Sequence, residues 1–104
     1  MTYEEELTRV VDYLRSMPLP KLSRPVEPGD QGPTRAELAR DLAQWLADAG
    51  ARAERQPLRA VPDVGDPAVG DQVAVTGADL LRAQPDPAVL AEASDRLRTL
   101  RLTV

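Results

Sequence analysis

The chain has 104 residues, a formal net charge of −4, and no His, Cys or Phe. Without Cys it has no disulfide framework and no thiol nucleophile, and without His it has no imidazole base and no zinc site of the common types. Its content of 42% hydrophobic and 29% charged residues is typical of a globular protein. The length fits one domain, so we expect residues 1–104 to fold as a single unit.

The first predicted helix covers residues 2–17. Thr2 and Glu5 have the spacing of a capping box, in which each side chain satisfies a backbone N–H at the start of a helix. Pro18 and Pro20 end the segment, because proline cannot continue a helix. Its apolar residues recur at helical spacing and share one face: Tyr3, Leu7, Val10, Val11, Leu14 and Met17.

A second helix is predicted over residues 34–49. Thr34 and Glu37 repeat the capping box, and Gly50 is expected to cap the C-terminal end. Trp45 lies on the apolar stripe, so we interpret it as the largest core residue rather than as a ligand-stacking group. The stripe consists of Leu38, Leu42, Trp45, Leu46 and Ala49.

Two connections precede and follow this second helix. Residues 18–33 contain five prolines and two glycines, which predicts an irregular loop without a helix or a strand. A connection of this length is unusual in a compact domain and is either functional or loosely ordered. Residues 51–65 form a second linker, rich in Arg and Pro.

The tetrapeptide Asp-Pro-Ala-Val occurs twice, at residues 66–69 and 86–89. Asp at the N-cap followed by Pro at the first helical position is a strong signal for the start of a helix. We therefore predict helices over residues 66–84 and 86–101. A competing interpretation places a short strand at residues 72–76, where Val73 and Val75 alternate between Gly70 and Gly77. The tail after residue 101 either folds back onto the domain or pairs with another chain.

These segments predict an all-α fold. The very short connection at residues 84–85 favours antiparallel packing of the last two helices. We expect a four-helix up-and-down bundle, with the Pro-rich segment 18–33 as a long first crossover.

The residue types present give little support for a catalytic function. Carboxylates could bind Mg²⁺, and Glu92 and Asp95 match half of the acidic pattern of all-helical nucleotide pyrophosphohydrolases, but the first half of that pattern has no counterpart with the right spacing. Glu92 lies four residues before Arg96, which predicts an ion pair on a solvated helix face. We therefore expect no catalytic residues, no metal and no cofactor.

Nucleic acid and membranes are disfavoured as partners. The sequence pI is about 4.8, whereas a protein that binds phosphate backbones usually has a basic face. Residues 34–42 resemble the first helix of bacterial helix-turn-helix domains, but residues 43–47 continue the helix where the turn should follow. No apolar run approaches the roughly 18 residues of a membrane span, and the acidic N-terminus lacks a signal core, so we expect a cytoplasmic protein.

Two hypotheses for function remain. The first is a non-enzymatic protein–protein interaction module, which binds either a different protein or a second copy of itself. Its candidate partner-binding residues are the apolar residues that lie off the helical stripes: Tyr13, Val75, Leu102 and Val104. The alternative is a small-molecule binder, or an enzyme of unrecognised type, with a cleft under the 18–33 loop. Its polar groups would be Lys21, Arg24, Glu27 and Asp30.

Overall fold

The computed structural model describes residues 1–29 and 31–104, and the regular structure in these two ranges is helical. The all-α prediction is therefore confirmed. The region 72–76 lies inside a helix, so the alternative of a strand there is wrong. The elements are α1 (Tyr3–Ser16), α2 (Leu19–Leu22), α3 (Arg35–Ala53), a 3₁₀ turn at Asp66–Ala68, α4 (Val69–Arg82) and α5 (Pro87–Thr103).

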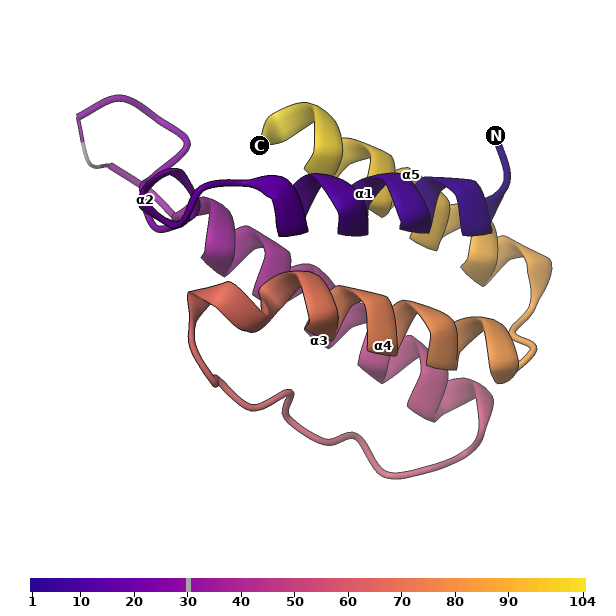
Figure 1. Ribbon diagram of the computed structural model, residues 1–104. Coiled ribbons are helices and arrows are strands. Elements are labelled where there is room, and N and C mark those ends of the chain that lie inside the picture. Colours follow the sequence, from indigo (N-terminus) through magenta and orange to yellow (C-terminus); the bar gives the residue numbers. More distant parts are fainter. Residues whose placement is uncertain (30) are drawn as a thin grey trace.

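The four long helices lie in two layers, with α1 and α5 above α3 and α4 in the view of Figure 1. The helices α1 and α4 run antiparallel, and a side-chain hydrogen bond connects them near each end. The Tyr3 hydroxyl donates to the Gly77 carbonyl oxygen at 2.7 Å, and Arg15 Nε donates to Asp71 Oδ1 at 2.9 Å. Of the four neighbouring pairs, α3 and α5 pack least closely.

The order of directions differs from the up-and-down arrangement expected from the sequence, which is not confirmed. α3 and α4 run in the same direction (Figure 1). Near their starts, Arg40 Nη2 lies 3.1 Å from Asp66 Oδ1, and near their ends a Cβ on Gly50 would lie 3.6 Å from Leu80 Cα. The linker after α3 returns along the length of that helix, so α4 begins beside the start of α3.

The two predicted capping boxes form, whereas the two predicted Asp-Pro caps make no side-chain cap hydrogen bond, and one predicted helix end is wrong. Both capping boxes, Thr2 with Glu5 and Thr34 with Glu37, are formed. The prediction that Gly50 caps its helix is wrong, because α3 continues to Ala53. Gly50 is buried against the backbone of Leu80, where an added Cβ would make an ordinary van der Waals contact at 3.6 Å.

Two further segments are more helical than predicted. Within 18–33, residues Leu19–Leu22 form the short helix α2, in which Pro20 occupies a first-turn position where its missing N–H costs nothing. The last helix extends to Thr103 and carries the predicted tail with it. The Val104 N–H donates to the Leu100 carbonyl oxygen at 2.9 Å, which continues the helical hydrogen-bond pattern, and the Val104 side chain is buried in the core.

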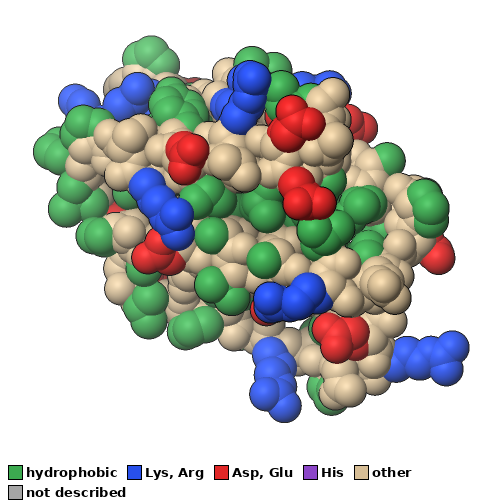
Figure 2. Space-filling model, turned by 45° about the vertical axis from the view of Figure 1, so that its right-hand side comes forward, with side chains coloured by type: hydrophobic (Ala, Val, Ile, Leu, Met, Phe, Trp, Pro, Cys, Tyr) green, Lys and Arg blue, Asp and Glu red, His purple; other side chains and the backbone are tan. Residues whose placement is uncertain are grey.

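The hydrophobic core lies between the two layers and receives side chains from all four long helices. The core is filled mainly by aliphatic residues. Trp45 packs at its edge and is only partly buried. No helix in the described ranges has the length and apolar character needed to cross a membrane. On the face shown in Figure 2, basic and acidic side chains are interspersed with hydrophobic ones. The largest fully buried side chains are Leu46, Leu80, Leu97, Val10, Val69 and Val73.

Candidate functional site: a groove between α3 and α5

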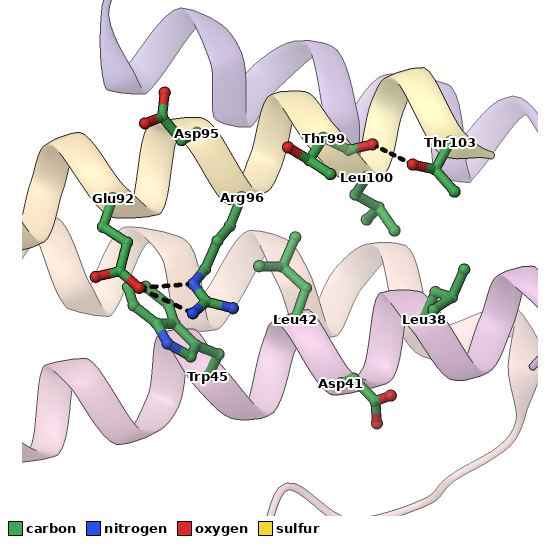
Figure 3. Close-up of a pocket in the computed structure, with 10 residues that line it drawn as sticks. All are labelled: Leu38, Asp41, Leu42, Trp45, Glu92, Asp95, Arg96, Thr99, Leu100 and Thr103. Atoms are coloured by element: carbon green, nitrogen blue, oxygen red, sulfur yellow. Dashed lines mark hydrogen bonds and ion pairs between the residues drawn. The ribbon is translucent and has the colours of Figure 1, made fainter.

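An apolar groove of about 440 Å³ runs along the loosely packed seam between α3 and α5 (Figure 3). Leu38, Leu42 and Trp45 enter it from α3, and Leu100 closes it from α5. The three α3 residues follow one another at helical spacing and form a continuous stripe. Because α5 covers this stripe only partly, Leu38 and Trp45 retain solvent exposure.

Arg96 crosses the groove at Trp45. Its guanidinium carbon lies 4.5 Å from the centroid of the Trp45 ring, within the range of a cation–π contact. Glu92 holds the same guanidinium, with its Oε2 2.8 Å from Arg96 Nη2 and 2.9 Å from Nε. The predicted ion pair between Glu92 and Arg96 is thus confirmed. Trp45 is therefore more than a core residue, because one face of its ring contacts the guanidinium of Arg96.

The rims of the groove are polar and mainly acidic. Asp41 stands on the α3 side and Asp95 on the α5 side, with Thr99 and Thr103 along α5 (Figure 3). Asp95 Oδ1 lies 3.0 Å from Arg98 Nη2, in an ion pair whose side chains are both more than half exposed. Beyond Trp45 and Glu92 the hollow continues to the end of the molecule, between Arg52 on α3 and the 84–86 turn.

The four predicted partner-binding residues come from different parts of the molecule. Val75 on α4 is 60% exposed and Leu102 on α5 is 72% exposed. Tyr13 on α1 is only half-buried, with Lys21 Nζ 6.0 Å from its ring centroid. Val104 is buried in the core, so its assignment to an exposed surface is wrong. Leu102 follows Asp95 by seven residues and therefore lies on the same helical face, at the rim of the groove.

Three of the four predicted ligand-binding residues do gather around one pocket. Lys21, Arg24 and Glu27 line a cavity of about 330 Å³, together with Arg35, which sequence reasoning missed. Arg35 donates to the backbone carbonyl oxygens of Lys21, Pro25 and Val104 at 3.2–3.4 Å. Its guanidinium thus ties the start of α3 to the Pro-rich segment and to the end of α5. The fourth predicted residue, Asp30, lies outside the described residues.

A polar junction joins the Pro-rich segment, α3 and the start of α4. Ser23 Oγ donates to Asp66 Oδ2 at 2.6 Å, and this hydrogen bond, with a further contribution from Arg40, holds the pKa of Asp66 below its usual value. Arg40 Nη2 also lies 3.3 Å from Asp63 Oδ1. The two copies of Asp-Pro-Ala-Val therefore differ: Asp66 makes tertiary contacts, whereas Asp86 precedes α5 without a side-chain cap bond.

Two buried polar groups of α1 connect it to its neighbours, Glu6 to α5 and Tyr3 to α4. Glu6 is 4% exposed and pairs with Arg101 at 3.1 Å, while its second oxygen, Oε2, has no hydrogen-bond partner. Burial raises the pKa of Tyr3 to about 12, consistent with its hydroxyl remaining a proton donor to Gly77. Both groups connect helices, and neither borders the groove between α3 and α5.

In residues 1–29 and 31–104, Asp and Glu side chains form no group of three or more that could hold a metal ion. Comparison with known proteins gave no match: no family model fits the chain, and no curated protein and no solved structure is significantly similar to it.

Proposed function

We propose that this chain is a non-enzymatic protein-interaction module that binds a helix of its partner in the groove between α3 and α5. The observation that carries this proposal is the stripe of Leu38, Leu42 and Trp45, which α5 leaves partly open. An apolar groove between two helices is a common receptor for the apolar face of a third helix. Leu102, exposed at the rim, extends the apolar surface available to the partner.

The test is a selection from a displayed library of 16-residue helical peptides. We expect the wild-type protein to enrich peptides with apolar residues at positions i, i+4 and i+7. Thr99→Arg should abolish the enrichment, because Thr99 lines the groove and is exposed, so the long side chain fills the groove without disturbing the core. Thr8→Arg makes the same substitution at an exposed position of α1, away from the groove, and serves as the matched control.

Three outcomes of this selection are informative. Enrichment by wild type and Thr8→Arg but not by Thr99→Arg supports the proposal. Failure of the wild-type protein to enrich any helical peptide contradicts it. Equal enrichment by all three proteins also contradicts it, because the peptides would then bind somewhere other than the groove.

A second candidate function is binding of a small anionic molecule in the Pro-rich pocket. The observation in its favour is that, among the described residues, Lys21, Arg24 and Arg35 line one cavity with one carboxylate, that of Glu27. A ligand that binds only the folded state raises the unfolding temperature. We expect a panel of small carboxylates and phosphates to stabilise the wild-type protein, and a Lys21→Ala/Arg24→Ala variant to lose that stabilisation while keeping any helix binding in the groove.

A further inference from the structure

The charges around the groove restrict the kind of helix that it can accept. The lining includes three carboxylates, Asp41, Glu92 and Asp95, and one guanidinium, that of Arg96. Glu92 and Arg96 neutralise each other across the Trp45 ring. The charge left beside the groove is therefore negative on both sides, from Asp41 on α3 and Asp95 on α5, whose carboxylates point outward from the outer edges of the two helices (Figure 3).

Both rim carboxylates are available to a partner. Asp41 is exposed and makes no ion pair with another described residue. Asp95 pairs with Arg98, but both side chains are more than half exposed, and exposed pairs of this kind contribute little free energy. A cation brought by the partner can therefore share the Asp95 carboxylate with Arg98.

We propose that the partner helix carries Lys or Arg on both sides of its apolar stripe, an inference that rests on the proposed function. Its apolar side chains would contact Leu38, Leu42 and Leu100, and its two basic flanks would face Asp41 and Asp95. The stretch from Glu92 to Thr103 along α5 spans about 16 Å, which corresponds to a partner helix of about three turns.

The acidic rims also make a second copy of this chain a poor occupant of the groove. Val75, the most exposed large apolar residue of α4, lies four residues from Asp71 on one side and four from Asp79 on the other. Asp71 pairs with Arg15 and Asp79 pairs with Arg82, so docking this face into the groove would bring mixed-charge pairs, without a net positive charge, against the acidic rims. The charge pattern thus favours a different, basic molecule.

Two synthetic peptides test this inference. Each has 14 residues without Trp or Tyr, and Leu at positions 4, 8 and 11. One has Lys and the other Glu at the positions that border the Leu stripe. Trp45 is the single Trp and lines the groove, so its emission reports binding. Since one exposed ion pair is worth up to about fivefold in affinity, we expect the Lys peptide to bind about tenfold more tightly at low salt.

Charge reversal on the rims supplies the decisive comparison. Asp41→Lys/Asp95→Lys should invert the preference, so that the Glu peptide binds more tightly. Glu4→Lys/Asp12→Lys changes the net charge by the same amount on exposed α1, and it should keep the preference for the Lys peptide. The preference should also shrink in 0.5 M salt, because rim charges are screened.

Several results would overturn the inference. Equal affinity for the two peptides, or tighter binding of the Glu peptide to the wild-type protein, excludes basic flanks while leaving the groove as a helix-binding site. Binding of neither peptide also overturns it, and the library selection then decides separately whether the groove accepts any helix. Concentration-dependent dimerisation that Thr99→Arg abolishes would assign the groove to a second copy instead.

Discussion

Asp66 connects three segments of the chain through one carboxylate. It accepts a hydrogen bond from Ser23 in the Pro-rich segment and another from Arg40 on α3, while it begins the turn that leads into α4. Sequence reasoning identified Asp66 correctly as the start of a helical segment, because Asp followed by Pro is a local signal. Its two tertiary partners lie 43 and 26 residues away, and no local pattern specifies them.

The pH dependence of stability should change in an Asp66→Asn variant. The pKa of Asp66 is lowered in the folded state, so the carboxylate stabilises the fold above its unfolded-state pKa, and this contribution is lost as pH falls through the folded-state pKa. At pH 7 we expect the variant to lose roughly 1 kcal/mol, a value reduced by partial solvent exposure. Below about pH 4 the difference from wild type should shrink towards zero.

Urea unfolding at pH 7 and at pH 2.5 measures this difference. Asp12→Asn is the matched control, because Asp12 is exposed on α1 and has no ion-pair or hydrogen-bond partner among the described residues. A difference between wild type and Asp66→Asn that stays constant between the two pH values would show that the carboxylate charge is not what stabilises the junction.

At the scale of the helices, glycines mark where neighbours approach most closely. Gly50 and Gly77 both lie inside helices, where glycine costs up to about 1 kcal/mol relative to alanine. Their surroundings differ. A Cβ on Gly50 would make an ordinary contact with Leu80 Cα at 3.6 Å, whereas a Cβ on Gly77 would lie 2.5 Å from Leu7 Cδ1.

The two alanine substitutions should therefore have opposite effects. Gly50→Ala should stabilise the protein by about 0.5–1 kcal/mol, because it gains helix propensity without a clash. Gly77→Ala should destabilise it by about 1 kcal/mol, because the overpacking against Leu7 and the Tyr3 hydroxyl exceeds the same gain. Thermal unfolding of both variants checks this. Equal stability of the two would mean that Leu7 moves aside freely.

Sequence patterns predict the helices better than their contacts. The capping boxes fix the starts of α1 and α3, because both partners lie within four residues. The apolar stripe of residues 34–49 identifies which face of α3 is buried, but not how much of it the neighbouring helices cover. Leu38 and Trp45 belong to that stripe and nevertheless border an open groove. Only the distance between α3 and α5 in the folded protein distinguishes a core residue from a groove residue.

At the scale of the whole molecule, the parallel pairing of α3 and α4 depends on the linker between them. The short turn at 84–85 reverses the direction of the chain, so α4 and α5 run antiparallel (Figure 1). The prediction that they pack against each other is wrong, because α4 packs on α1 and α3, whereas α5 packs on α1 and α3 from the other side. The segment between Ala53 and Asp66 is long enough either to turn back at once or to retrace α3. The local sequence does not decide between these paths, which explains why the predicted up-and-down order is not confirmed.

Shortening this linker tests the arrangement directly. The chain must return from Ala53 to the level of Arg40, about 20 Å along the axis of α3. Deleting residues 56–63 leaves four residues, which reach at most about 14 Å when fully extended. We expect this deletion to abolish cooperative unfolding or to lower the unfolding temperature steeply, as followed by circular dichroism.

A variant in which residues 56–63 are replaced by Gly and Ser at constant length separates the effect of the linker's length from the effect of the linker's contacts. It loses the Arg40–Asp63 ion pair and the other side-chain contacts of the linker, whereas the two hydrogen bonds of Gln44 go to backbone groups that Gly and Ser retain. It also keeps the length needed to retrace α3. We expect it to unfold cooperatively at a moderately lower temperature. If the deletion variant instead unfolds like the wild-type protein, then α4 can pack antiparallel to α3, because a four-residue connection permits only that direction.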